Sequence, residues 1–580
     1  MSLFSQRTYP NEVTASLERH GIDPLFARLY AARGIQEYSD LSLEAKHLLP
    51  PSSLKECETA ARLLADAIAS KRSMVIVADY DCDGATACAV GMRGLRMLGA
   101  SEEQLGYLVP NRFTMGYGLT PEVVDMALEF NPRPSLLITV DNGIASHQGI
   151  DYAKTHGIDV LVTDHHLPSD QLPNALAIVN PNQPECAFSS KALAGVGVMF
   201  YILIALRALL RERGVLTVET QPKLEPLFSL VALGTVADVA QLDRNNRILV
   251  SQGLRKIRQG LAPAGLLALF EVAGRDPRSA SPFDLGFAIG PRLNAAGRLA
   301  DMSLGIQLLL CDDEVRATSL AQELDRINRE RRVIESGMQE SALASLANLS
   351  VNEQPALCLW HPDWHQGVVG IVASRLKERF NRPTIVFAPA DDDSGTRLLR
   401  GSGRSIQGFH LRDALDLVSK KYPGLILKFG GHAMAAGLTI RQSDFNDFEN
   451  YFREISASLL DDEILQRRCI HDGPLSPDQF TVDIADRLMQ EMWGQGFPQP
   501  LFYGEFEVLQ QSLMKDKHLR LSLRPIVNGE SHTPVLSAVW FNRTQTLPQL
   551  AFLAFRLVSD RFRDEARIQL IIEAIDDPLH

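Results

Sequence analysis

Short apolar runs alternate with helical stretches between residues 74 and 180, and this alternation constrains the fold more than any other feature of the chain. The runs are rich in β-branched residues and occupy residues 74–79, 105–110, 136–141, 159–164 and 177–180. Helical patterns lie near residues 85–98, 120–130 and 145–156. Strands that alternate with helices in this way form parallel sheets covered by helices. The sequence therefore predicts an α/β domain built on a parallel sheet.

Three further units follow this domain. Residues 312–349 lack internal proline and place apolar residues on one side at helical spacing, namely Leu320, Leu324, Ile327, Ile334 and Met338. They predict one helix of ~50 Å, long enough to join two domains. Residues 355–460 carry glycine motifs in a second α/β pattern. In residues 518–524 leucines alternate with polar residues, including Arg520 and Arg524, which predicts a small C-terminal β-barrel or sandwich.

The net charge argues against a protein that coats nucleic acid with its whole surface. The 580 residues include 58 Lys and Arg and 70 Asp and Glu, a formal net charge of −12. Residues 375–432 differ, because 11 Lys and Arg face only 6 Asp and Glu there. Any polyanion site is therefore expected to be local, and a solvated face is the alternative interpretation of this segment.

Cysteine usage and the start of the chain indicate a cytoplasmic protein. The seven cysteines are scattered without a C-x-x-C pair, so no thiolate zinc site is expected. The N-terminal residues lack the basic-then-apolar pattern of a secretory signal. The apolar stretch 192–206 ends at Arg207, short of the ~20 residues that cross a bilayer. We predict a buried helix there and no membrane association.

Carboxylates and histidines follow three of the predicted strands. The clusters are Asp79, Asp81 and Asp83; Asp141; Asp164, His165 and His166; and, in a fourth segment, Asp238. The carboxyl ends of parallel strands lie along one edge of a sheet, so these side chains are expected to converge. For Asp141 taken alone, a helix N-cap is the alternative.

The D-x-D-x-D-G pattern of residues 79–84 also opens calcium-binding EF-hand loops. An EF-hand requires a glutamate where this chain has Val90, and a helix where it has a predicted strand. The carboxylates and imidazoles suit Mn²⁺ or Mg²⁺ instead. Without cations, burying so many like charges would be costly. Two divalent ions ~3.5 to 4 Å apart are the usual arrangement for phosphoester hydrolysis.

The motifs D-Y-D-C-D-G, V-D-N-G, T-D-H-H and G-T-V-A-D occur in this order and resemble those of the DHH phosphoesterase superfamily. Flanking segments extend the resemblance to the RecJ family of bacterial single-strand-specific exonucleases; they lie at residues 110–119, 290–298, 365–380, 401–405 and 429–437. The resemblance implies an N-terminal extension and four successive parts: a DHH catalytic domain, a connecting helix, a DHH-associated domain and an OB-like β domain. The implied bounds are 1–50, 51–311, 312–350, 351–465 and 466–580.

The resemblance also implies a metal centre with Asp141 as the bridging ligand. The implied metal ligands are Asp81, Asp83, Asp141, His165 and Asp238. Asp83 and His166 are the implied catalytic residues, with His166 on the scissile phosphate. Superfamily members often have a histidine four residues before the first ligand, where this chain has Val77. Water or Asp79 would complete that shell, and Asp79 is the weaker candidate because it can simply orient the loop.

Contacts to DNA are implied at a second set of residues. The set is Arg112, Arg292, Arg298, Ser402, Arg404 and His432. Ser402 and Arg404 would hold the 5′ phosphate together with Arg292 or Arg298, although residues 401–405 alone also fit an ordinary glycine-rich turn. Arg520 and Arg524 fit a backbone-binding groove, for which a solvated or protein-docking face is the alternative.

The implied function is 5′-to-3′ hydrolysis of single-stranded DNA to 5′-mononucleotides with two Mn²⁺ or Mg²⁺ ions, in DNA repair and recombination. The implied enzyme is a monomer whose partners are single-stranded DNA-binding protein and a RecQ-type helicase. The alternatives are a phosphodiesterase of short oligonucleotides or other small phosphoesters, and a silent scaffold like Cdc45. Occupied ligand positions disfavour the scaffold, and the long helix and C-terminal unit disfavour the small-substrate enzyme. The chain lacks G-x-x-x-x-G-K-[ST], so unwinding requires a partner.

Overall fold

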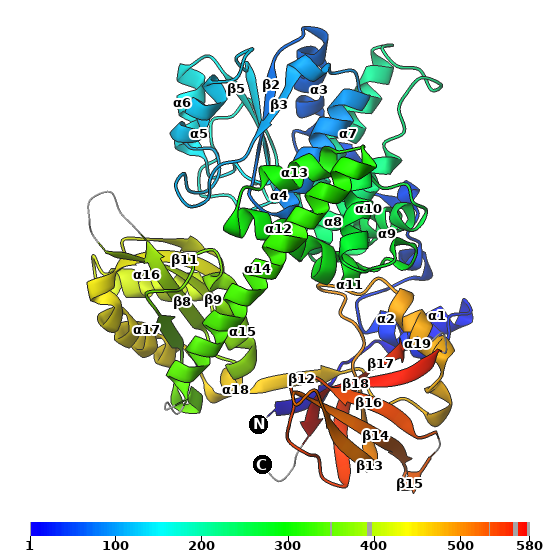
Figure 1. Ribbon diagram of the computed structural model, residues 1–580. Helices are drawn as coiled ribbons and strands as arrows, with labels where there is room; N and C mark the ends of the chain where they lie inside the picture. Colours follow the sequence, from blue (N-terminus) through cyan, green and yellow to red (C-terminus); the bar gives the residue numbers. More distant parts are fainter. Residues whose placement is uncertain (1, 348–350, 391–396, 533, 561–565, 577–580) are drawn as a thin grey trace.

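The computed structural model describes residues 2–347, 351–390, 397–532, 534–560 and 566–576 (Figure 1). Its first sheet is parallel throughout, with strand order β3-β2-β4-β5-β6. The strands are β2 (Met74–Ala78), β3 (Leu105–Leu108), β4 (Leu136–Val140), β5 (Asp159–Thr163) and β6 (Ala177–Val179). Each strand coincides with one predicted apolar run, so the predicted α/β domain is confirmed.

Helices cover both faces of this sheet. Successive strand residues point to opposite faces, so Ile76 and Val77 of β2 lie in two different apolar cores. One face carries α3 (Cys57–Ala69), α4 (Cys82–Met97) and α7 (Gly195–Glu212), and the other carries α5 (Pro121–Leu128) and α6 (His147–Thr155). The apolar stretch before Arg207 is therefore a buried helix. Within the described ranges, no helix is both long and apolar enough to cross a membrane.

A helical layer extends the first domain and leads into the predicted long helix. Its members include α8 (Phe228–Ala237), α9 (Arg244–Arg258), α10 (Ala264–Val272), α12 (Gly290–Leu299) and α13 (Ser303–Leu310). The long helix is α14 (Glu314–Leu346), and Asp313 caps it by accepting the N–H of Arg316. Leu324 lies in the core of the first domain and Met338 in a core of the next domain. The helix therefore joins the two domains as predicted.

The second α/β domain has a mixed sheet of order β10-β11-β9-β8-β7. Its strands are β7 (Leu357–Trp360), β8 (Thr384–Ala390), β9 (Leu398–Arg404), β10 (Lys428–Gly431) and β11 (Ala435–Arg441). Only β7 and β8 are parallel to each other. Helix α15 (Val369–Phe380) packs on one face beside α14, while α16 (Leu411–Lys421) and α17 (Phe445–Leu459) cover the other.

The C-terminal part is a closed β-sheet, which confirms the predicted barrel. Its long strands are β13 (Phe502–Met514), β14 (His518–Val527), β16 (Leu536–Trp540), β17 (Leu550–Asp560) and β18 (Arg567–Asp576). Because β13 pairs with both β14 and β17, the sheet closes on itself. The leucines of residues 518–524 are buried and Arg520 is exposed, as the alternation predicts. Arg524, however, forms an ion pair of 3.0 Å with Glu507 on β13.

The N-terminal segment binds to the C-terminal part, more than 400 residues away in sequence. Strand β1 (Ser2–Gln6) pairs in parallel with β12 (Arg467–His471), and Figure 1 shows these blue and orange segments together. The guanidinium of Arg33, just after α2 (Pro24–Ala31), donates to both carboxylate oxygens of Asp472 at 2.9 Å. Both side chains are almost fully buried. This ion pair is the centre of the contact between the chain ends.

Replacing Asp472 by asparagine is expected to destabilise this contact by about 3–5 kcal/mol, because it leaves the buried Arg33 cation without its counter-charge. Denaturant unfolding of the full-length variant measures the loss. The same substitution at the exposed Asp478 is the control and is expected to leave the midpoint unchanged. Equal midpoints for the two variants would contradict a stabilising role of the Arg33–Asp472 pair.

Candidate metal centre and nucleic-acid interface

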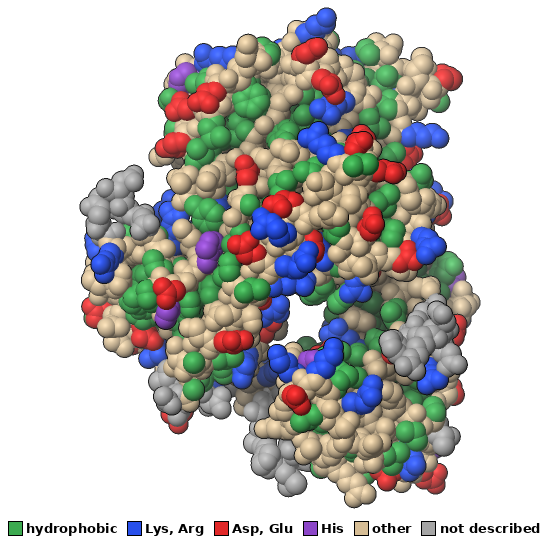
Figure 2. All heavy atoms as spheres, viewed as in Figure 1, with side chains coloured by type: hydrophobic (Ala, Val, Ile, Leu, Met, Phe, Trp, Pro, Cys, Tyr) green, Lys and Arg blue, Asp and Glu red, His purple; other side chains and the backbone are tan. Residues whose placement is uncertain are grey.

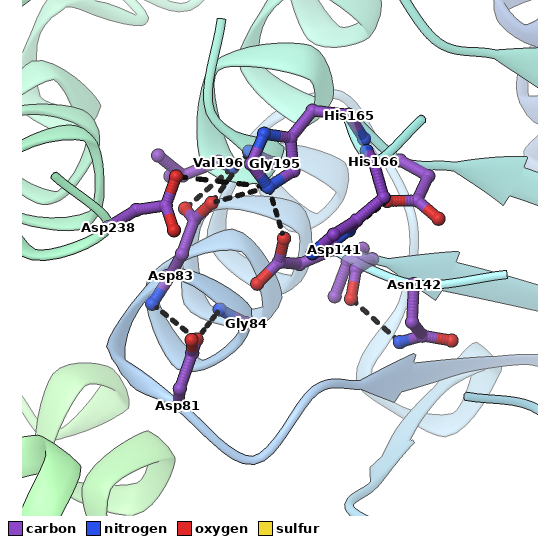
Figure 3. Close-up of polar contacts among 12 residues, drawn as sticks. Asp81, Asp83, Gly84, Asp141, Asn142, His165, His166, Gly195, Val196 and Asp238 are labelled. Atoms are coloured by element: carbon purple, nitrogen blue, oxygen red, sulfur yellow. Dashed lines mark hydrogen bonds and ion pairs between the residues drawn. The ribbon is translucent and has the colours of Figure 1, made fainter. Parts of the chain in front are cut away.

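The sheet brings the predicted ligands together at the carboxyl ends of β2, β4 and β5. The Nε2 atom of His165 lies 3.0 Å from Oδ1 of Asp141, 3.9 Å from Oδ2 of Asp83 and 3.8 Å from Oδ2 of Asp238 (Figure 3). Asp238 reaches this point from the C-terminal end of α8. Residues that follow three separate strands and one helix thus face a common space.

The possible ligand atoms form three groups, and Asp141 belongs to two of them. A first group contains Asp83, His165 and Asp238, a second contains Asp79, Asp81 and Asp141, and a third, with Asp141, His165 and His166, links the first two. In each group the ligand atoms lie within 4.8 Å of one another. Since Asp141 also contacts His165 of the first group, its carboxylate stands between the two. This arrangement has the form of a two-cation site with one bridging carboxylate.

Backbone N–H groups orient the first two ligands. Oδ1 of Asp81 accepts hydrogen bonds from the N–H groups of Asp83 and Gly84 at 2.9 and 3.0 Å, and so caps α4. The carboxylate of Asp83 accepts the N–H groups of Gly195 and Val196 at 2.6 and 2.9 Å, at the start of α7 (Figure 3). These bonds hold both carboxylates on rigid helix termini, as an ion site requires.

Asp141 has an unusual backbone conformation beside a close helix. Its φ of +63° lies in the left-handed region, which aspartate tolerates better than most residues. The first residue of α7, Gly195, packs against it, and a Cβ atom added there would lie 2.7 Å from the Asp141 Cβ. A side chain at residue 195 would therefore displace the carboxylate that joins the two groups.

Asp164 organises the histidine pair, although the sequence motif alone did not assign it a role. Its Oδ1 accepts the N–H groups of His165 and His166 at 2.7 and 3.1 Å and contacts Nδ1 of His166 at 2.8 Å. Its Oδ2 accepts the N–H of Ile144 at 2.9 Å. With both oxygens engaged, Asp164 is a support for the histidines and not a further ligand.

The chemistry of the site fits divalent cations. Oδ1 of Asp79, Oδ1 of Asp141 and Nε2 of His165 are buried, and none of these atoms has a hydrogen-bond partner among the described residues. Burial and then the neighbouring His166 lower the pKa of His165 to about 4, so its imidazole is neutral and offers a lone pair. Buried oxygen and imidazole donors without thiolates suit Mn²⁺ or Mg²⁺.

Repulsion among the buried carboxylates also indicates a site for divalent cations. Burial and then neighbouring carboxylates raise the pKa values of Asp79, Asp141 and Asp238 well above the ordinary range, and that of Asp83 to about 7. These acids resist ionisation because they are buried and because their negative charges repel one another. Divalent cations between them would stabilise the ionised forms.

Stabilisation by Mn²⁺ is therefore expected to increase with pH. A carboxyl whose pKa is raised on folding stabilises the fold below its ordinary pKa of 3.8, and this contribution is lost as pH rises towards about 7 for Asp83. Bound Mn²⁺ requires ionised carboxylates, so the increase in melting temperature with saturating Mn²⁺ should grow from about pH 5 to about pH 8.

Thermal melts at matched ionic strength test this expectation. Replacing Asp238 by asparagine removes one carboxyl group with a raised pKa, so the increase in melting temperature with Mn²⁺ should depend less on pH. An increase in melting temperature that is independent of pH, or largest in acid, would contradict it.

His166 differs from His165 in charge. Burial lowers the pKa of His166, but the hydrogen bond to Asp164 and the charges of Asp164, Asp79 and Asp238 together outweigh burial and raise the pKa to about 9. A cationic imidazole suits a phosphate oxygen better than a metal ion. The phosphate role stays a prediction, since one nitrogen of His166 also lies within ligand distance of Asp141 and His165.

Asp79 lies among the candidate ligands. In the sequence it was the weaker candidate for a metal ligand, because it could simply orient the loop. Its buried carboxylate lies with those of Asp81 and Asp141, and Val77 is buried within β2. Asp79 and Asp81 are two residues apart in one loop, and this spacing was the available signal. Asp79 therefore stays a candidate ligand beside Asp81 and Asp141.

Three arginines form a cluster without acidic partners. Burial and then the positive charges of Arg112 and Arg404 lower the pKa of Arg298 to about 10. Nη1 of Arg404 donates to Oγ of Ser402 at 3.0 Å, and the Arg112 guanidinium lies 4.6 Å above the ring of Tyr80. Within the described ranges, no carboxylate oxygen lies within 4.0 Å of these guanidinium groups. Such a cluster is suited to an anion.

The cluster spans both α/β domains and lies near the candidate ligands. Arg298 ends α12 of the first domain and donates to the carbonyl oxygen of Gly367 in the second at 3.2 Å. The charge of Asp81 also acts on Arg298. His432 of the second domain influences the pKa of His165. Arg404 and His432 of the second domain thus act electrostatically on Arg298 and His165 of the first, and the DNA contacts of Ser402, Arg404 and His432 stay a prediction.

Arg292 is engaged inside the first domain, and its contact with phosphate stays a prediction. Its guanidinium is buried, donates to Asp325 of α14 at 3.0 Å and to the carbonyl oxygen of Ala288 at 2.6 Å. With its donors engaged inside the first domain, Arg292 fastens α12 to α14. Arg298 remains as the arginine of this segment that can hold phosphate.

The molecule has an opening at its centre. Figure 2 shows it between the first domain, the second α/β domain and the C-terminal barrel, with Lys and Arg side chains on its rim. Three acids of the basic segment 375–432, Asp391, Asp392 and Asp393, lie outside the described residues. A basic rim around an opening matches the expectation of a local polyanion site in an acidic chain.

Comparison with known proteins agrees with the three-part architecture. Family models match residues 73–235 (DHH family, N-terminal domain), 352–458 (DHHA1 domain) and 471–574 (RecJ OB domain). The single-stranded-DNA-specific exonuclease RecJ of Salmonella typhimurium is 48% identical over 565 residues, which cover 96% of each chain. The chain belongs to the RecJ family. The Escherichia coli RecJ shows the same identity and coverage.

Solved RecJ structures share the fold. RecJ of Thermus thermophilus in complex with Mn²⁺ has a TM-score of 0.80 and 29% identity, covering 100% of this chain and 80% of that one. The same protein with Mg²⁺ has a TM-score of 0.75 and 28% identity. RecJ members thus bind the two cations that suit the donor set of this chain.

Proposed function

We propose that this RecJ-family chain hydrolyses single-stranded DNA from the 5′ end and releases 5′-mononucleotides, in DNA repair and recombination. One observation carries the proposal: two groups of ligand atoms meet at Asp141, beside a cluster of unpaired arginines. The groups of ligand atoms supply the chemistry for phosphodiester hydrolysis. The arginine cluster supplies a site for a terminal phosphate.

In this proposal some residues bind the cations and others bind the substrate. Asp79, Asp81 and Asp141 would hold one cation, and the remaining ligands with Asp141 would hold the other; these are Asp83, His165 and Asp238. When bound, two divalent cations supply the charge stabilisation and water activation that phosphodiester hydrolysis needs. His166, whose pKa is raised to about 9, would carry a positive charge beside this space and bind an oxygen of the scissile phosphate.

The arginine cluster accounts for cleavage from an end. A 5′ phosphate held by Arg298 and Arg404 would fix the terminal nucleotide in the boundary between the domains. The next phosphodiester along the strand would then lie at the metal centre, so each hydrolysis would release one nucleotide. Arg112, which lies over the ring of Tyr80 and acts electrostatically on Arg298, would bind the backbone.

Specificity for single strands would follow from the space available to DNA in the opening and from contacts that do not depend on the base sequence. The central opening with its basic rim (Figure 2) would accept one strand by its phosphates. Arg520, exposed on the barrel, would extend this path. We also propose single-stranded DNA-binding protein and a RecQ-type helicase as partners of a monomeric, cytoplasmic enzyme. A partner must separate duplex strands, since the chain has no P-loop motif.

We propose domain bounds close to those predicted. The DHH catalytic domain would cover residues 51–311, the connecting helix 312–350 and the DHH-associated domain 351–465. Residues 466–580 would form the OB-like domain, to which residues 1–50 contribute their β1 strand through β12.

Labelled DNA tests the function directly. Single- and double-stranded DNA with a label at the 5′ or 3′ end is incubated with Mn²⁺, Mg²⁺ or EDTA. We expect rapid release of labelled mononucleotide from 5′-labelled single strands only, with either cation and not with EDTA. Mononucleotide release from the 3′ label first, or equal cleavage of duplexes, would contradict the proposal.

A further inference from the structure

Tyr117 touches the backbone of the bridging ligand, and nothing in the sequence motifs assigns it a role. Its hydroxyl donates a hydrogen bond of 3.0 Å to the carbonyl oxygen of Asp141. This carbonyl belongs to the residue with φ of +63°. The bond therefore helps to hold a peptide in a conformation that residues with side chains rarely adopt, together with the bond from the Asp141 N–H to the carbonyl oxygen of Thr163.

The half-exposed Tyr117 also contacts His166, since its hydroxyl lies 3.2 Å from Nδ1 of that histidine. Its ring meets those of Tyr80 and His166 edge-on, at centroid distances of 6.2 and 5.7 Å. Glycines flank it on both sides in the left-handed region, with φ of +78° at Gly116 and +79° at Gly118. Because residues with side chains rarely adopt this conformation, the glycines set the path of the loop that presents Tyr117.

The same loop is bound by the second α/β domain. Nη1 of Arg400 on β9 donates to the carbonyl oxygen of Phe113 at 2.9 Å. The ring of Phe113 meets that of His365 edge-on at 6.3 Å. The loop therefore touches Asp141 at one end and the second domain at the other.

We propose that Tyr117 is a positioning residue: by holding the Asp141 peptide, it aims the shared carboxylate between the two ligand groups. The inference rests on the metal centre of the proposed function. Tyr117 does not bind the cation itself, and its hydroxyl acts through Asp141. Without this hydrogen bond the carboxylate can turn towards one group, and cation binding weakens.

The test compares Tyr117→Phe with Tyr152→Phe in the full-length protein. Each substitution removes only a hydroxyl, and that of Tyr152 donates to Asp125 at 3.0 Å on the surface of the first domain. Mn²⁺ binding without DNA is measured by electron paramagnetic resonance. Cleavage of single-stranded DNA is measured as a function of Mn²⁺ and of DNA.

We expect Tyr117→Phe to raise the Kd for Mn²⁺ about tenfold, within the range seen for groups that orient ligands. The KM for DNA should stay the same, and cleavage should recover at high Mn²⁺. Tyr152→Phe should match the unchanged protein. An unchanged Kd for Mn²⁺ in Tyr117→Phe would overturn the inference, and so would a loss that high Mn²⁺ does not restore. Failure of the unchanged protein to bind Mn²⁺ would instead overturn the proposed function.

Discussion

Replacing Asp141 by asparagine is expected to lower the turnover of single-stranded DNA by at least about a thousandfold. Asp141 belongs to one group of ligand atoms and lies 3.0 Å from His165 of the other, so the substitution is expected to weaken both cation sites at once. Asparagine keeps the volume of the side chain and tolerates the backbone φ of +63°. Alanine would combine the loss of the ligand with backbone strain, so asparagine gives the clearer result.

The fold of this variant should survive, because the substitution removes one of several repelling carboxyls. The pKa of Asp141 is raised by burial and by Asp83 and Asp81, and a neutral amide avoids that cost. The control is Asp159→Asn, at the other end of β5, where Asp159 pairs with Arg72. Turnover is measured with excess Mn²⁺. An Asp141→Asn variant that keeps more than about a tenth of the activity would contradict a bridging role.

Replacing Arg404 by alanine is expected to lower kcat/KM for 5′-phosphorylated strands about a hundredfold. Two charge-assisted hydrogen bonds to a phosphate contribute about 1.5–3 kcal/mol each, and part of this loss is recovered by Arg298. Strands with a 5′ hydroxyl should lose far less, so the preference for a phosphorylated end should fall. Mn²⁺ binding should not change, since Arg404 contacts none of the candidate ligands.

Arg441→Ala is the matched control for this prediction. Arg441 ends the neighbouring strand β11 and pairs with Asp444 at 3.3 Å on the surface. Its removal should leave the cleavage of phosphorylated and of hydroxylated strands as it is in the unmodified protein. If the unmodified protein already cleaves phosphorylated and hydroxylated ends equally, the arginine cluster does not bind the 5′ phosphate.

The sheet and the position of its candidate ligands could be predicted, because the strands follow from the local apolar pattern and the meeting of the ligands follows from the parallel topology. The parallel strands are buried on both faces, so they read as continuous apolar runs such as 74–79. Their carboxyl ends then bring Asp83, Asp141 and His165 together whatever the lengths of the connections. The long helix followed in the same way from its uninterrupted apolar side.

The features that the sequence missed depend on contacts between distant segments. Arg292 and Arg298 lie in one glycine-containing segment, but the segment is helix α12, and six residues turn them to different faces. Arg292 thus meets Asp325, and Arg298 meets the second domain. The pairing of β1 with β12 has no local signal at all. Tyr117 likewise acquires its role only when the loop folds onto Asp141.

Anomalous diffraction from crystals soaked in Mn²⁺ tests the central claim most directly. The account predicts two Mn²⁺ ions per chain, ~3.5 to 4 Å apart, with the Asp141 carboxylate contacting both. One ion should also contact Asp79 or Asp81, and the other Asp83 and His165. A single ion, or two ions bound away from Asp141, would contradict it.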